Sequence, residues 1–368
     1  MRVVITGADG FIGKNLRVAL MERAGTEVLP ITRDSAPRAL VQAIAQADAV
    51  VHLAGVNRPQ SNHEFAVGNA DFTLTVCNAV RSAARPVPLL LSSSTQAKRD
   101  NLYGASKRAA ENHVFSLATD AGSPVAVYSL PNVFGKWARP NYNSAVATFC
   151  HNAVHGLPLV IHDPAAVVRL VYVDDVVADF LRRLDGDWPA DGRAEVAPVY
   201  EATVGELADT IQTFRSSRQS LMTAPVGTGL TRALYATYVS YLPPGQFTYD
   251  LPKHGDARGV FVEMLKTPDC GQFSFFTAHP GVTRGGHYHH TKTEKFLVIK
   301  GMARFGFRHI LSGETFELHT SGDQPTVVES VPGWAHDITN VGDTEMFVML
   351  WANEVFDRAR PDTYAHKV

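Results

Sequence analysis

The sequence has few cysteines and no long hydrophobic run, and these absences exclude several kinds of protein. Its 368 residues include three cysteines, Cys77, Cys150 and Cys270, none in a C-x-x-C pair. An odd number of widely spaced cysteines argues against a disulfide framework or a thiolate metal site, so we expect free thiols in a reducing cytoplasm. No apolar run approaches the ~20 residues of a membrane helix. A strand and glycine loop occupy the N-terminus, where cleavage of a signal peptide would destroy them.

An excess of charge of either sign is also missing. The chain carries 34 basic and 36 acidic residues, a formal net charge of −2. This balance argues against nucleic acid or an anionic membrane as a partner. The length suits two domains, each able to bury a core of its own.

Two sequence patterns follow each other along the chain. Up to residue 243, short apolar segments alternate with helical patterns, which predicts an α/β Rossmann-type domain with a parallel sheet. The segment 241–245, YLPPG, has the composition of a linker. From residue 246 to 368, alternating strands and Gly/Asp turns predict an all-β barrel or jelly roll. We expect strands at 2–6, 27–31, 49–53, 88–92, 125–130, 272–278, 294–300, 302–308 and 345–351, and helices at 11–24, 36–45, 69–85, 103–121, 204–214 and 230–241.

The first loop, VVITGADGFIG, has the pattern of a dinucleotide-binding site. Its glycines allow a tight turn and a close approach of the backbone to a pyrophosphate, which would rest on the helix N-terminus. The strand–turn–helix context strengthens this interpretation over a glycine turn without a ligand. The expected cofactor contacts in the loop are Gly7, Gly10, Phe11, Ile12 and Gly13.

The end of the second strand bears on the choice of cofactor. Arg33 stands where an acidic residue would bind the ribose of NAD, and a guanidinium there would pair with a 2′-phosphate. We therefore expect NADPH. The alternative is that Arg33 is a solvated loop residue and Asp34 contacts the ribose.

Tyr103 and Lys107 form Y-x-x-x-K, one helical turn apart. A neighbouring ammonium and the positive charge of a nicotinamide can lower the pKa of a phenol enough for proton transfer near neutral pH. Three serines, Ser92, Ser93 and Ser94, end the preceding strand. Together with the glycine loop they make a chance Y-x-x-x-K a poor explanation.

These residues resemble the extended short-chain dehydrogenase/reductase family of nucleotide-sugar enzymes. The resemblance implies that Tyr103 is the acid/base, that Lys107 positions it and contacts the cofactor, and that Ser94 holds the substrate oxygen, with Ser93 as a second candidate. The spacing of nine residues between Ser94 and Tyr103 is shorter than the family's. The matching positions also include His52, Leu53, Ala54, Gly55, Asn69 and the strings 130–135 and 171–175; Leu53 and Ala54 are expected to contact the cofactor.

A further set of residues corresponds to the family's substrate side. Arg169, just before a strand expected at 171–175, matches the position where relatives contact the nucleotide diphosphate. Asn132 lies in the string 130–135, and Lys136 and Asn141 in the segment that follows. Each could equally belong to ordinary surface structure.

The C-terminal half contains a metal-ligand pattern. GVTRGGHYHHTKTEKFLVIKG fits G-x5-H-x-H-x4-E-x6-G with His287, His289 and Glu294, and a later PGWAHDITN supplies His336. On a strand, His287 and His289 share a face, and the other two can complete four ligands. Imidazole and carboxylate suit Zn, Fe, Ni or Mn.

Both motifs resemble those of the cupin superfamily over residues 246–368, although the superfamily includes non-catalytic sugar binders. The second motif departs slightly, with Val331-Pro-Gly333 in place of the usual P-x-G. The string DARG around Arg258 is similar to one in cupin-fold sugar 3,5-epimerases, which implies a sugar-nucleotide contact for Arg258. His290 and Lys292 are weak candidates for a cupin base.

Over its full length the chain resembles the bifunctional capsular polysaccharide enzymes that make UDP-2-acetamido-2,6-dideoxy-L-talose. The resemblance implies a zinc cupin that epimerises C3 of a UDP-4-keto sugar, reduction of C4 by NADPH, and a homodimer. Two alternatives stay open. The cupin could be a binding or dimerisation module on a simple 4-reductase or 4-epimerase, or the chain could be a sensor without turnover.

Overall fold

The structure is a computed structural model that describes residues 1–252, 254–256, 259–261, 264–265, 267, 271–354 and 359–368. The chain forms two compact units. Unit 1 comprises Met1–Ser144 and Val167–Ala202, and unit 2 comprises Ala145–Ala166 and Thr203–Val368. Each helix in these ranges is too short or too polar to cross a membrane.

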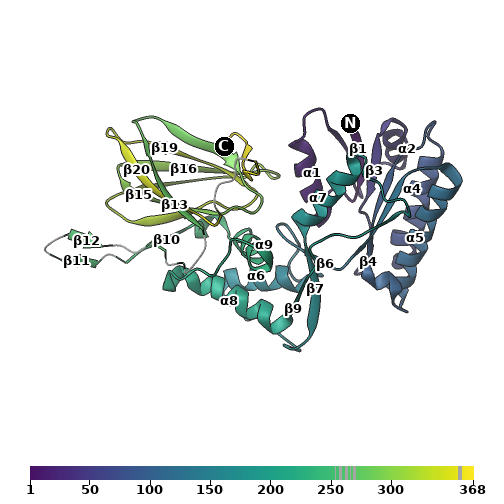
Figure 1. The fold of residues 1–368 in the computed structure, drawn as a ribbon, viewed down its shortest axis with the longest axis horizontal. Helices are drawn as coiled ribbons and strands as arrows, with labels where there is room; N and C mark the ends of the chain where they lie inside the picture. The colour runs from purple at the N-terminus through teal and green to yellow at the C-terminus, as the bar shows by residue number, and fades with distance from the viewer. Residues whose placement is uncertain (253, 257–258, 262–263, 266, 268–270, 355–358) are drawn as a thin grey trace. The chain divides into compact units, whose positions relative to one another are not determined.

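Unit 1 is built on a six-stranded parallel sheet (Figure 1). After β1 the chain adds β2 on one side and then β3 on the other, so the strand order changes direction between β1 and β3. Doubly wound folds bind a nucleotide at this position. This confirms the predicted Rossmann-type fold. In sheet order the strands are β2 (Glu27–Ile31), β1 (Arg2–Thr6), β3 (Ala49–His52), β4 (Leu89–Ser94), β5 (Val125–Leu130) and β8 (Arg193–Ala194).

Helices cover both faces of this sheet because alternate residues of its strands are apolar on both sides. Val3 and Ile5 pack with residues of α1 (Phe11–Met21) and α7 (Val173–Leu184). Val4, between them in sequence, packs in a second core on the opposite face. That core is formed with α2 (Pro37–Gln46), α4 (Phe72–Arg81) and α5 (Leu102–Ala121). A short helix α3 (His63–Phe65), a π-helix η1 (Ala66–Asp71) and a 3₁₀ turn η2 (Thr95–Lys98) complete the connections.

A second, three-stranded sheet in unit 1 joins β6 (Asn132–Phe134), β7 (Val167–Tyr172) and β9 (Tyr200–Thr203). The strand expected at 171–175 is wrong in its bounds. β7 ends at Tyr172, and helix α7 starts at Val173 with Asp174 and Asp175 in its first turn. Carboxylates in that position favour a helix N-terminus. Arg169 therefore lies within the strand and not before it.

The α-helices of the described part of unit 2 are α6 (Ala145–His155), α8 (Val204–Ser220) and α9 (Gly229–Val239). The two latter helices were expected, whereas α6 was not. The segment 241–245, expected to be a linker, lies within this unit and contains the buried Leu242 and the start of a 3₁₀ turn, η3 (Pro244–Gln246). The two compact units therefore do not meet at residues 243–246. The domain boundary expected there stays a prediction.

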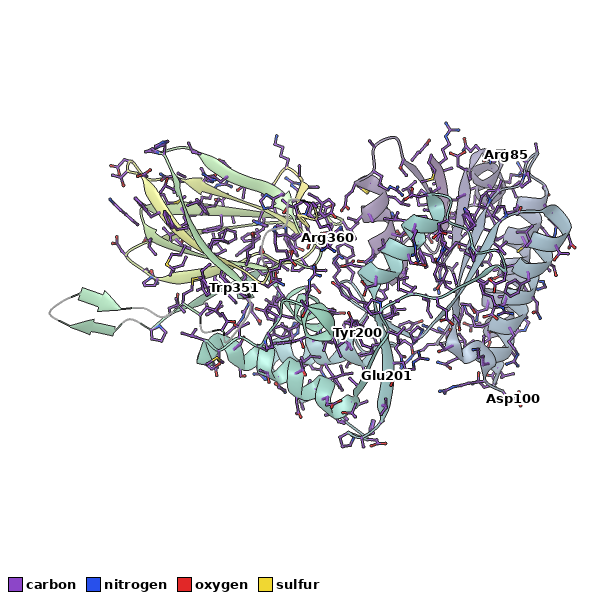
Figure 2. All side chains as sticks on the ribbon, viewed as in Figure 1. Arg85, Asp100, Tyr200, Glu201, Trp351 and Arg360 are labelled. Carbon is purple, nitrogen blue, oxygen red and sulfur yellow. The ribbon has the colours of Figure 1, made fainter. Side chains whose placement is uncertain are left out.

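The rest of unit 2 is an antiparallel two-sheet barrel, which confirms the expected jelly-roll type of fold. Its core is aromatic: Phe305 and Phe307 are almost fully buried, and so is Trp351, labelled in Figure 2. Phe247 packs edge-on against Phe307 and Trp334. One sheet has the order β10 (Thr248–Asp250), β18 (Thr326–Glu329), β15 (Glu294–Lys300), β20 (Met346–Ala352), β13 (Gln272–Ala278); the other has β17 (Thr315–Ser321), β16 (Met302–His309), β19 (Trp334–Asn340), β14 (Thr283–Tyr288), β21 (Tyr364–Ala365); β11 (His254–Asp256) pairs with β12 (Gly259–Phe261).

Candidate active sites

The glycine loop between β1 and α1 has room for backbone only. Gly7 has a φ of +68°, and a Cβ there would lie 2.7 Å from the backbone nitrogen of Ala54. A Cβ on Gly13 would lie 2.4 Å from the carbonyl oxygen of Gly7. No side chain of the described residues caps α1, and its first turn has no acidic residue. The loop therefore offers backbone N–H groups and a positive helix end to an anion.

The segment after β3 lies directly against this loop. The backbone N–H of Leu53 donates to the carbonyl oxygen of Thr6 at 3.1 Å, and that of Ala54 to the Thr6 hydroxyl at 3.3 Å. The same hydroxyl is 2.6 Å from Nδ1 of His52, whose Nε2 is 2.9 Å from the Thr73 hydroxyl. Burial, and then the charge of Lys107, lower the pKa of His52 to about 3. His52 is thus a neutral structural residue beside the loop.

The residues expected to discriminate between cofactors lie just beyond β2. Both Arg33 and Asp34 are exposed. Gly7 N–H donates to the carbonyl oxygen of Ile31 at 2.9 Å, which brings the end of β2 beside the glycine loop. The position fits a contact with the adenosine ribose, and both residues stay candidates for it.

Helix α5 carries the Y-x-x-x-K pair next to the end of β4. Its first turn is fixed by Asn101, whose side chain accepts the N–H of Gly104 at 2.7 Å. The Ser94 hydroxyl lies near the phenol of Tyr103 and lowers its pKa against the effect of burial. Lys107 is 7% exposed, and its ammonium donates to the carbonyl oxygen of Ser92 at 2.9 Å. The structure therefore brings Ser94, Tyr103 and Lys107 together.

Ser93, the alternative serine, has a different partner. Its hydroxyl donates to the carboxylate of Glu111. Successive strand residues point to opposite faces, so only one of two adjacent serines can reach Tyr103. In this geometry that serine is Ser94.

The expected lowering of the tyrosine pKa is not found in the protein itself. Burial raises the pKa of Tyr103, and the Ser94 hydroxyl only opposes this. Burial lowers the pKa of Lys107 to about 8, against the raising effect of Glu111. The physical reason is that the phenol loses water on burial, which disfavours the phenolate.

The π-helix supplies a residue whose role the sequence pattern did not define. The carboxamide of Asn69 holds Val56, accepting its N–H at 2.8 Å and donating to its carbonyl at 2.9 Å. It also donates to the Ser106 hydroxyl at 3.0 Å. A single π-turn is often found at functional sites. Here it links the loop after β3 to the helix that carries Tyr103.

The substrate-side candidates in unit 1 fall into two groups. Asn132 donates to the backbone carbonyl of Arg169 at 3.1 Å, and the exposed Arg169 pairs with Glu201 at 3.3 Å. Asn141 lies on a separate loop, with a left-handed φ of +54°. Lys136 is 1% exposed and pairs with Asp174 at 2.6 Å, so it is structural.

Next to Asn141, the ring of Tyr142 contacts two arginines from different loops, an arrangement that sequence patterns did not indicate. The guanidinium carbons of Arg58 and Arg139 lie 5.8 and 5.2 Å from the ring centre of Tyr142. Both arginines are exposed. Arg258 lies outside the described residues, so its predicted contact stays a prediction.

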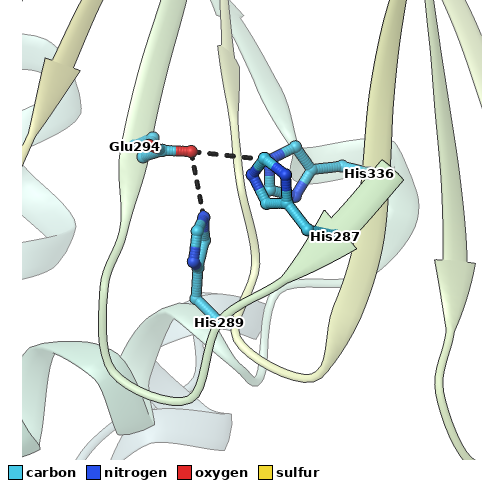
Figure 3. A group of neighbouring side chains, drawn as sticks. All are labelled: His287, His289, Glu294 and His336. Carbon is cyan, nitrogen blue, oxygen red and sulfur yellow. Dashed lines mark hydrogen bonds and ion pairs between the residues drawn. The ribbon is translucent and has the colours of Figure 1, made fainter. Parts of the chain in front are cut away.

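In unit 2 the four predicted metal ligands come together (Figure 3). One ligand atom from each of His287, His289, Glu294 and His336 lies within 4.8 Å of the others. A register shift between Gly285 and His287 places His287 opposite His336 across β14 and β19. Nε2 of His289 is 3.0 Å and Nε2 of His336 3.4 Å from Oε2 of Glu294.

The chemistry of this cluster fits a divalent transition metal. Burial and the neighbouring histidines lower the pKa of His287 to about 3, and burial lowers the pKa of His336. Glu294 keeps a pKa well below its usual value, because the neighbouring imidazoles of His289 and His336 outweigh its burial. Neutral imidazoles at His287 and His336 and an ionised carboxylate at Glu294 are ionisation states that metal coordination requires.

The weak candidates for a cupin base are held by neighbouring residues. The Lys292 ammonium donates to the carbonyl oxygen of Pro361 at 3.1 Å and to the Thr363 hydroxyl at 2.8 Å. The His290 ring lies 5.0 Å from that of Tyr364. These contacts favour structural roles for both residues.

Comparisons with known proteins agree with both halves. Residues 3–187 match the NAD dependent epimerase/dehydratase family, and residues 254–364 match the polysaccharide biosynthesis C-terminal domain. The chain belongs to the NAD dependent epimerase/dehydratase family, whose members bind NAD(P).

Particular relatives extend over the whole chain. The chain is 60% identical over 368 residues to the UDP-2-acetamido-2,6-beta-L-arabino-hexul-4-ose reductase of Pseudomonas aeruginosa, covering 100% of this chain and 99% of that protein. It is 40% identical in sequence to the capsular polysaccharide assembling protein CapF from Staphylococcus aureus. The crystal structure of that protein matches with a TM-score of 0.69 and complete coverage of both chains. The UDP-glucuronic acid 4-epimerase of Bacillus cereus, at 16% identity, a TM-score of 0.52 and coverage of 58% of this chain and 83% of that one, shares the fold.

Proposed function

We propose that the chain is a bifunctional UDP-sugar enzyme. Unit 2 would epimerise a UDP-4-keto-6-deoxy-N-acetylhexosamine at C3, and unit 1 would reduce the C4 ketone to give UDP-2-acetamido-2,6-dideoxy-L-talose, on the path to UDP-N-acetyl-L-fucosamine. The observation that carries the reduction is the Ser94–Tyr103–Lys107 arrangement in a chain 60% identical to a hexul-4-ose reductase. This supports a reductase over a sensor without turnover.

For the reduction, Tyr103 is the proton donor to the C4 oxygen. Its raised pKa keeps the phenol protonated near neutral pH, which is the state that a reduction needs. Ser94 would donate a hydrogen bond to the same oxygen. Lys107, anchored on the carbonyl of Ser92, would hold the cofactor ribose and stabilise the phenolate left behind.

The cofactor proposed is NADPH, which supplies the hydride. Its pyrophosphate would lie on the N-terminus of α1, where Gly7 and Gly13 leave no room for side chains. The exposed Arg33 would pair with the 2′-phosphate. If Asp34 is the ribose contact instead, Arg33→Ala would not reduce the preference for NADPH over NADH.

The epimerisation is assigned to the barrel. A ketone at C4 acidifies the hydrogen at C3, so a base can remove it and return it to the other face. His287, His289, Glu294 and His336 would hold one divalent metal, most suitably zinc, which would supply Lewis-acid stabilisation of the developing oxyanion. We propose a homodimer, from the resemblance to the capsular enzymes, and a location in the cytoplasm, from the odd number of widely spaced cysteines.

Two variants test the division of labour. The wild-type enzyme is incubated in D₂O with the 4-keto substrate and NADPH, and NADPH absorbance and deuterium at C3 are followed. Tyr103→Phe should stop NADPH oxidation and leave deuterium exchange. His336→Ala should stop the exchange, whereas His319→Ala, an exposed histidine on β17, should change neither.

The results separate the alternatives. Loss of both activities in Tyr103→Phe would show that the two steps share one site. Persisting exchange in His336→Ala would make the barrel a binding module on a simple reductase. Without NADPH oxidation by the wild type, the proposed substrate class is wrong.

A further inference from the structure

The segment 359–368 lies against the strand that carries the first metal ligand. Its strand β21 pairs with β14, so that Ala365 is opposite His287 and Tyr364 opposite Tyr288. The rings of Tyr288 and Tyr364 stack with centroids 5.5 Å apart. The N–H of His366 donates to the carbonyl oxygen of Gly286 at 2.9 Å. The segment is therefore part of the wall around the candidate metal centre.

Asp362 fixes the loop 290–293, which joins the ligands His289 and Glu294. Its carboxylate accepts the backbone N–H groups of His290, Thr291 and Lys292 at 2.9, 2.8 and 2.7 Å, and the Thr291 hydroxyl at 3.0 Å. Three successive N–H groups around one anion form a nest. Burial alone would raise the pKa of Asp362, but the hydrogen bonds from this loop keep it below its usual value.

The same residue orients a metal ligand through its backbone. The carbonyl oxygen of Asp362 lies 2.6 Å from Nδ1 of His289. A carbonyl can only accept, so Nδ1 is the donor in this contact, which fixes the direction of the ring. Nε2 lies 3.0 Å from Glu294 and is therefore the ring nitrogen that faces the candidate metal position.

The loop has further contacts with other segments of unit 2. The N–H of Thr293 donates to the side-chain oxygen of Asn353 at 2.9 Å, and Arg232 contacts the Thr291 hydroxyl. Arg232 in turn pairs with Glu354 at 3.1 Å. Asn353 thus holds the end of the loop next to Glu294, whereas Asp362 holds the residues next to His289. The distinctive contribution of Asp362 is thus the placement of the end that carries His289.

We infer that Asp362 is a positioning residue of the metal centre, which sets the direction of His289 and the path of the loop to Glu294. The inference rests on the metal site of the proposed function. It predicts a defect in metal binding at a residue that is not itself a ligand. Loss of such partners typically weakens metal affinity about 10–100-fold.

The test compares zinc affinity in the full-length wild type, Asp362→Ala, Asp362→Asn and Asp343→Ala, by competition with a chromogenic chelator. Asp343 is an exposed carboxylate on a turn of the same barrel and serves as the matched control. Asp362→Ala should bind Zn²⁺ about 10–100-fold more weakly. Asp362→Asn should lose less, because its amide oxygen still accepts from the loop.

A further readout separates positioning from a loss of stability alone. The Co²⁺-loaded Asp362→Ala variant should show shifted visible absorption bands, because the metal would be held in a changed geometry, whereas lower stability by itself would leave the bands of the folded protein in place. Wild-type zinc affinity in both Asp362 variants would overturn the inference alone. A wild type that binds no zinc would overturn the metal site and the inference together. If Asp362→Ala does not fold, an Asp362→Asn variant with unchanged affinity and cobalt spectrum decides against the inference.

Discussion

A buried carboxylate in unit 2 lies between two cations and allows a quantitative test of the fold. Glu329 is 3% exposed and pairs with Arg218 on helix α8 and with Lys295 on strand β15. Arg218 also donates to the carbonyl oxygen of Gln246 at 2.6 Å. The Lys295 ammonium lies 3.2 Å from the Tyr249 hydroxyl. The cluster ties a helix to the sheet that also carries Glu294.

Replacing Glu329 by Gln removes the only negative charge of this triad and keeps the shape. Burial alone would raise the pKa of Glu329, but Arg218 and Lys295 keep it below its usual value, so the wild-type side chain is ionised at neutral pH. Removing one partner of a buried ion pair costs about 3–5 kcal/mol, because the other charge is left uncompensated. At about 2–4 °C per kcal/mol, the melting transition of unit 2 should fall by about 10 °C.

The assay is thermal and urea unfolding followed by tryptophan fluorescence and calorimetry. Glu317→Gln is the matched control, because Glu317 pairs with Arg304 at the exposed surface of the same barrel. The control should be indistinguishable from the wild type. If Glu329→Gln also unfolds within ~1 kcal/mol of the wild type, the triad is not the buried ionic cluster described above.

Three further outcomes are expected. Gly13→Ala should raise the Kd for NADPH at least about tenfold by calorimetric titration, because the new Cβ would lie 2.4 Å from the carbonyl oxygen of Gly7; an unchanged Kd would contradict the close packing of the loop. Ser94→Ala should lower kcat/KM for NADPH oxidation about 100-fold, and Ser93→Ala much less; equal losses would refute the assignment of the donor. The kcat/KM should fall as pH rises through about 8, where the Lys107 ammonium loses its proton. The unfolded chain keeps this proton up to pH ~10.4, so between pH ~8 and ~10.4 it binds more protons than the folded protein. The free energy of unfolding measured in urea should therefore rise over this pH range, and a flat profile would refute the lowered pKa of Lys107.

Much of the architecture could be predicted because it depends on local patterns. The glycines at 7, 10 and 13 and the alternating apolar strands are visible without tertiary information, as is the histidine spacing around His287 and His289. The start of α7 was missed because the valines of the string VYVDDVV are typical of a strand. Asp174 and Asp175 favour the first turn of a helix, but two acidic residues alone did not indicate where the strand ends.

The contacts that complete each site could not be predicted, because they join distant segments. Asp362 belongs to no motif, and nothing in its neighbourhood connects it to the loop after His289. The choice of Ser94 over Ser93 depends on the tertiary placement of α5, which brings Glu111 to Ser93 and Tyr103 to Ser94. The direction of the pKa shift of Tyr103 depends on burial, which the Y-x-x-x-K spacing cannot indicate.

The bulge that places His287 has a consequence for mutational scanning. Gly285 has a φ of +93°, and a Cβ there would lie 2.9 Å from the carbonyl oxygen of His336. Gly286 follows with a φ of +76°. Neither contributes an atom to the ligand set, yet both fix the turn of backbone that aims a ligand. A scan that considers only side chains able to bind a metal would leave both positions out, although at Gly285 neither the backbone angle nor the space admits a side chain.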